Sequence, residues 1–157
     1  MDVLVALFVA GALNLFVLSR IRRQTEPEEG RFLARTYLQT IALRYLLAFF
    51  LFVNLDAAGV TGISAFAYTF WGDSSTYDLG GHLLSRSWGG EITVNPYLNR
   101  QHQSGVGFIY FVSLLYYVFG RNQLLVQLVN GIIGGLTVLV IYAIAARLFD
   151  RASARWA

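Results

Sequence analysis

Long apolar runs almost free of charge are the feature that most limits how this chain can fold. They occupy residues 3–18, 37–55, 106–119 and 124–149. Only 13% of the residues are Asp, Glu, Lys or Arg, about half of the roughly 25% found in soluble domains. The apolar residues come in blocks and not in amphipathic stripes, which disfavours a soluble globule, a nucleic-acid-binding arm and a disordered tail. The sequence therefore predicts an all-α integral membrane protein with three to four transmembrane helices.

The first apolar run is expected to form an uncleaved N-terminal anchor helix over residues 1–19. The start, Met1-Asp2, lacks the basic region of a signal peptide, and no good small-residue cleavage site follows. All twelve basic residues of the chain are Arg, and five of them lie between Ser19 and Thr36. The positive-inside rule places this segment, residues 20–36, in the cytoplasm and the N-terminus outside.

A short helix is predicted to begin in this cytoplasmic segment and to lead into the second span. Thr25 is expected at the helix cap, Pro27 at the first helical position and Glu28 in the first turn. The second span is predicted over residues 37–55. Arg44 lies near its inner end, where a long side chain can reach the interface.

Residues 56–104 are too polar to cross the membrane and too rich in aromatic residues to be a mere linker. They hold four of the nine acids, both His and two of the three Trp. We expect an outer loop with interfacial helices that carries the functional side chains, since loops on a rigid scaffold often do.

The last segment, residues 105–157, leaves two arrangements open. Residues 106–119 would make a helix of only about 21 Å, whereas residues 124–149 form the strongest span, and the chain end after it is basic. If 106–119 crosses the membrane, this basic end lies outside, against the positive-inside rule. If it stays at the outer interface, three full spans place the basic end in the cytoplasm. Within the last span, Gly131 and Gly135 predict close helix packing, and Asn130 an interhelical hydrogen bond.

Asp73 is the candidate catalytic acid. It follows a flexible Gly and lies between Trp71 and Tyr77. These aromatic rings would partly desolvate the carboxyl group and raise its pKa toward a range useful for a general base. The competing interpretation is structural: Asp73 or Ser74 would cap an interfacial helix that continues through Leu84.

The outer cations also have two interpretations. Arg86, Arg100 or His102 could hold an anionic phosphate at the level of the lipid headgroups. They could equally anchor the loop at the interface or pair with Asp78 or Glu91. A metal site formed by His82 and His102 has no support from their spacing, and no cofactor is expected.

An ordered set of short motifs resembles a known family. It comprises Gly72-Asp73-Ser74 with Tyr77, then Leu83-Leu84, Gly105-Val106-Gly107, Phe119-Gly120, Leu128-Val129-Asn130-Gly131 and Arg147-Leu148-Phe149. The order is similar to the N-terminal part of GT-C glycosyltransferases of the protein-mannosyltransferase and aminoarabinose-transferase type. The resemblance implies transfer of a sugar from a polyprenyl-phosphate carrier to an acceptor at the outer face of the membrane, here a bacterial inner membrane with residues 56–104 facing outward. By this resemblance Asp73 activates the acceptor, and the substrate-binding candidates are Tyr77, Asp78, Arg86, Arg100 and His102.

Such transferases have more spans than this chain, so we expect either a piece of a longer enzyme or a short relative. The alternative function is a non-catalytic small membrane subunit that packs against a larger complex. The expected partners are the lipid bilayer, a polyprenyl-phosphate-linked sugar and other membrane subunits, and no nucleic acid. A transporter is less favoured, because no predicted span carries an acid.

Overall fold

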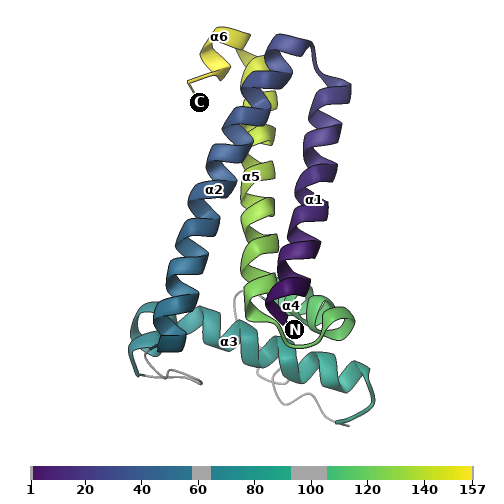
Figure 1. Cartoon of the computed structure of the whole chain (residues 1–157), viewed down its shortest axis with the longest axis vertical. Coiled ribbons are helices and arrows are strands. Elements are labelled where there is room, and N and C mark those ends of the chain that lie inside the picture. Colours follow the sequence, from purple (N-terminus) through teal and green to yellow (C-terminus); the bar gives the residue numbers. More distant parts are fainter. Residues whose placement is uncertain (1, 58–64, 93–105, 157) are drawn as a thin grey trace. The chain divides into compact units, whose positions relative to one another are not determined.

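The described residues of the chain form six helices in the computed structural model (Figure 1). The structure describes residues 2–57, 65–92 and 106–156, with side chains for residues 3–50, 76–92 and 106–156. In chain order the helices are α1 (Asp2–Gln24), α2 (Pro27–Ala57), α3 (Ala65–Trp88), α4 (Val106–Phe119), α5 (Gln123–Leu148) and α6 (Arg151–Ala154). The described residues contain no strand, which confirms the predicted all-α class.

Two of these helices are candidate membrane spans. Within the described part of the chain, Val3–Gln24 of α1 and Gln123–Leu148 of α5 are long and apolar enough to cross a bilayer. Large apolar side chains on both helices are exposed, among them Leu4 (74%), Phe8 (78%) and Ile144 (52%). The core helix of a soluble protein would bury such side chains. Residues 37–55, the second predicted span, belong to α2, which is not among the two candidates.

The chain divides into two compact units, the first of which comprises Val3–Phe50 and Gln127–Ala157. Within it α2 packs closely against α5. A Cβ atom added at Gly135 would lie 2.8 Å from Cε2 of Tyr37 and 2.9 Å from Cδ1 of Ile41, and one at Gly131 would lie 3.1 Å from Cε1 of Tyr45. The predicted close packing of this glycine pair is confirmed.

Asn130, beside these glycines, is exposed on α5. It makes no interhelical hydrogen bond to a side chain that the structure describes, so the bond predicted for it stays a prediction.

Polar contacts join two segments of the first unit that are far apart in the sequence. Glu29, in the first turn of α2, pairs with Arg151 of α6 at 3.2 Å and accepts a hydrogen bond of 3.0 Å from the hydroxyl of Tyr142. Glu28 lies 3.7 Å from Arg155. The turn between α1 and α2 therefore lies at the same end of this unit as the last turns of α5 (Figure 1).

Local chemistry explains where α2 begins. Pro27 opens the helix and Glu28 and Glu29 follow in its first turn, as predicted from the sequence. Acidic side chains stabilise this position because unpaired backbone N–H groups give the helix start a partial positive charge. Thr25 does not have its predicted role: its hydroxyl donates to the carbonyl of Ile21 at 2.6 Å, so it completes the end of α1 instead of capping α2.

The second unit comprises Leu51–Val126, and in it α3 packs against α4. Gly81 permits the contact, because a Cβ atom there would collide with the side chain of Val112. Gly120, with φ of 78°, ends α4 in a left-handed conformation that suits glycine. The side-chain oxygen of Asn122 then accepts from the backbone N–H of Leu125 at 3.0 Å and starts α5.

Candidate functional site

The main polar cluster of the second unit is built around Asp78 of α3. Its Oδ1 accepts a hydrogen bond of 2.5 Å from the hydroxyl of Tyr116 on α4. The guanidinium of Arg121, which follows α4, donates to both carboxylate oxygens. The side chain of Asp78 is only 12% exposed, so this cluster clamps α3 to α4 and to the turn that follows.

The partners of Asp78 keep its carboxyl group ionised. Burial by itself raises the pKa of this group, but hydrogen bonds from Arg121, Tyr116 and Gln123, together with the positive charge of Arg121, bring the pKa below its usual value. The same hydrogen bond to Asp78 raises the pKa of Arg121. Asp78 was predicted to bind substrate, and to do so it would have to give up these partners.

Tyr77, another predicted substrate-binding residue, packs on α4. Its ring meets that of Phe108 edge to face, with 5.0 Å between centroids. Trp88, at the end of α3, contacts the rings of Tyr110 and Tyr117 at 6.2 Å and 6.0 Å. Aromatic pairs of this geometry contribute about 0.5–1.5 kcal/mol each beyond the area they bury, so they hold α3 and α4 together along their length.

Two basic residues of the outer region have described side chains: Arg86 is paired, and the pKa of His82 is lowered. Nε of Arg86 lies 2.7 Å from Oε2 of Glu91, and both side chains are exposed. This confirms the pairing with Glu91 that was one of the alternatives. Burial lowers the pKa of His82, and the positive charges of Arg121 and Arg86 lower it further.

The remaining predicted site residues are Asp73, Arg100 and His102. Arg100 and His102 lie outside the described residues, and so does the side chain of Asp73. The backbone of Asp73 belongs to α3, which begins eight residues earlier at Ala65. The capping alternative for Asp73 and Ser74 is therefore wrong, because neither residue is at the helix start. Asp73 precedes Tyr77 by four residues, about one helical turn.

Two features of the structure were missed by reasoning from the sequence. One is the pairing of Asp78 with Arg121, residues 43 positions apart. The other lies in the first unit, where the amide of Asn14 donates to the hydroxyl of Tyr45 at 2.8 Å and accepts from that of Tyr37 at 2.7 Å. The available signal was that Asn14 is the one polar residue in the first apolar run.

No group of three or more His, Cys, Asp or Glu residues that could hold a metal ion is present among the described residues. Comparison with family models, with curated proteins and with solved structures finds no match. The structure thus defines an all-helical protein with two candidate membrane-spanning helices and a clamped pair of helices, α3 and α4.

Proposed function

We propose that the protein crosses the membrane three times, through α1, residues 37–55 of α2, and α5. The observation that supports this arrangement is the contact of Glu29 with both Arg151 and Tyr142. It brings the basic end of the chain to the same end of the first unit as the arginine-rich turn after α1. Both basic segments then lie in the cytoplasm, as the positive-inside rule requires.

In this arrangement α3 and α4 belong to the outer side of the membrane. A helix of 14 residues such as α4 extends about 21 Å, less than the roughly 30 Å of a hydrocarbon core. Its packing against α3 supports an interfacial pair of helices. The proposed location is a bacterial inner membrane with residues 56–104 facing outward.

We propose further that this outer region serves sugar transfer from a polyprenyl-phosphate carrier, as the resemblance to GT-C glycosyltransferases implies. The supporting observation is the engagement of Asp78 by Arg121 and Tyr116. Because Asp78 is engaged in this way, the catalytic acid that we propose is Asp73, one turn before Tyr77 in α3. Asp73 would take the proton of an acceptor hydroxyl, whose oxygen attacks the anomeric carbon. The bond from that carbon to the carrier phosphate breaks, and the phosphate leaves with the electron pair.

The phosphate that departs carries negative charge, which an arginine would stabilise. Arg100 is the proposed partner, because Arg86 already pairs with Glu91. Tyr77 and His102 remain proposed substrate contacts.

The experiment compares Asp73→Asn with Glu91→Gln in the native protein in its own membranes. Polyprenyl-phosphate-linked sugars are supplied, and loss of sugar from the carrier is measured. A general base contributes about 10²–10⁴-fold to a rate, so Asp73→Asn should lower transfer at least 100-fold while membrane insertion is unchanged. Glu91→Gln removes an acid from the same region and should retain activity. Normal transfer by Asp73→Asn would refute the assignment.

A second candidate function is a non-catalytic membrane subunit, and Arg44 is the observation that favours it. Its guanidinium lies against Gly134 in the middle of α5, yet the residue is exposed. An ionisable residue within a span usually pairs with another group, and an acid on a neighbouring subunit would serve. Co-purification of a partner that is lost in Arg44→Leu and kept in Asp73→Asn would favour this function over sugar transfer.

A further inference from the structure

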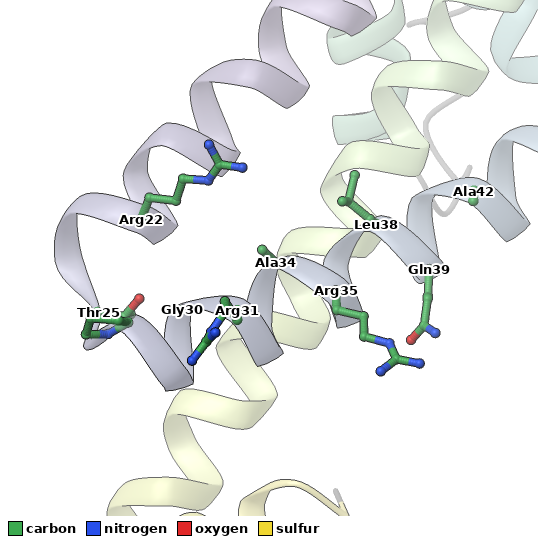
Figure 2. A pocket seen from close by; sticks show the side chains of 10 residues that line it. Arg22, Thr25, Gly30, Arg31, Ala34, Arg35, Leu38, Gln39 and Ala42 are labelled. Carbon is green, nitrogen blue, oxygen red and sulfur yellow. The ribbon is translucent and has the colours of Figure 1, made fainter.

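A groove between α1 and α2 in the first unit has a volume of about 960 Å³. Three arginines line one end of it, Arg22 from α1 and Arg31 and Arg35 from α2 (Figure 2). Ala34, between Arg31 and Arg35, forms an apolar wall together with Leu38 and Ala42, which lie farther along α2. We call this hollow the arginine groove. Its volume is in the range of sites that hold small molecules.

The arginines of the groove carry uncompensated positive charge. The lining contains no carboxylate, and none of the three pairs with an acid in the described part of the chain. Of the neighbouring acids, Glu29 pairs with Arg151, Glu28 lies near Arg155, and Glu26 does not line the groove. The groove therefore attracts an anion.

The shape of the groove indicates what kind of anion it holds. Arg31 and Ala42 are eleven residues apart in one helix, a distance of about 16 Å. The charged end lies in the segment with the cytoplasmic arginines, and the apolar wall leads toward the span of α2. A ligand that fits has an anionic head group at the arginines and a hydrocarbon tail along the apolar wall. A free phosphate would leave that wall uncovered.

We propose that the arginine groove binds an anionic phospholipid of the cytoplasmic leaflet, with its phosphate between Arg22, Arg31 and Arg35. The planar guanidinium groups donate paired hydrogen bonds to phosphate oxygens, and Leu38 and Ala42 contact the first part of an acyl chain. This inference rests on the proposed three-span arrangement, which places this end of α1 and α2 at the cytoplasmic side, and not on the proposed sugar transfer.

The test is native mass spectrometry of the full chain in detergent micelles, with palmitoyl-oleoyl-phosphatidylglycerol and palmitoyl-oleoyl-phosphatidylcholine in competition. We expect the protein to retain phosphatidylglycerol preferentially. Each arginine near an anionic lipid contributes about fivefold to binding. The variant with Arg22→Gln, Arg31→Gln and Arg35→Gln should therefore bind about 100-fold more weakly, and wild-type binding should weaken as salt rises.

A matched control has the same loss of charge outside the groove, through Arg20→Gln, Arg23→Gln and Arg147→Gln. None of these three residues lines the groove. This control should keep a clear preference for phosphatidylglycerol and bind it more tightly than the groove variant, although both triple variants have the same net charge. Far-UV circular dichroism checks that both triple variants retain their helices.

Ala34→Leu provides a second variant that keeps every charge. Its larger side chain fills the apolar wall, so it should lower lipid binding without any loss of charge. Three results would overturn the proposal: equal binding by the groove variant and its control, equal retention of the two lipids, or displacement of phosphatidylglycerol by millimolar inorganic phosphate. The last result would assign the site to a soluble anion.

Discussion

Replacing Asp78 by Asn perturbs the clamp between α3 and α4 without changing the size of the side chain. The substitution removes the charge that Arg121 and Tyr116 share. A hydrogen bond to a charged group contributes about 1.5–3 kcal/mol. We take about 1.5 kcal/mol for Tyr116, which is 4% exposed. For Arg121, whose side chain is 47% exposed, solvent screening reduces the contribution to about 0.5–1 kcal/mol.

The expected loss of stability in the second unit is therefore about 2 kcal/mol for Asp78→Asn. Hydrogen exchange of the backbone amides of α3 and α4 in detergent micelles measures it directly, because opening of this unit exposes them. The control is Glu91→Gln, which breaks the exposed pair with Arg86 and should cost less than about 0.5 kcal/mol. Equal protection in Asp78→Asn and the wild type would refute the clamp.

The pH dependence of the stability of the second unit tests the same interaction independently. The folded pKa of Asp78 is lowered, so its contribution is fully present above the unfolded pKa of about 3.9. The contribution disappears as the pH falls through the folded pKa. Wild-type protection of α3 and α4 should therefore fall below about pH 4, and Asp78→Asn should lack this part of the acid transition.

Two further predictions concern the first unit. Gly135→Leu should destabilise the packing of α2 on α5 by about 1–3 kcal/mol, since a Cβ atom there already meets Tyr37. Thermal unfolding in micelles measures this loss of stability. Gly11→Ala is the tolerated control, because a Cβ atom at Gly11 would meet nothing within 4 Å. Asn14→Leu removes the hydrogen bonds to Tyr37 and Tyr45 and should cost about 1 kcal/mol, at roughly 0.6 kcal/mol per interhelical bond. A more stable Asn14→Leu protein would contradict this.

The helices were predictable because their signals are local. The apolar run over residues 106–119 has the same bounds as α4, and Gly120, directly after the run, ends that helix. Pro27 marked the start of α2 for the same reason, since proline fits only the first turn of a helix. The close packing at the glycine pair of α5 was also predictable, because a residue without a side chain lets a neighbouring helix approach closely.

The partners of the polar residues were not predictable, because they depend on contacts between distant segments. Nothing in the sequence around Asp78 indicates that Arg121 will reach it across 43 positions. The chain offers several acids and twelve arginines, and helix register alone does not choose among them. The capping role of Asp73 was wrong because α3 begins earlier than the polar residues suggested, at Ala65.

The most direct test of the three-span arrangement is the labelling of single cysteines in intact cells by a membrane-impermeant maleimide. The chain has no cysteine of its own, so Gln24→Cys, Gly107→Cys and Trp156→Cys each report one position. We predict that only the cysteine at position 107 is labelled from outside, and that those at 24 and 156 react after the membrane is opened. Labelling of position 156 from outside, with position 24 protected, would contradict the account, because α5 would then end on the opposite side from the turn after α1.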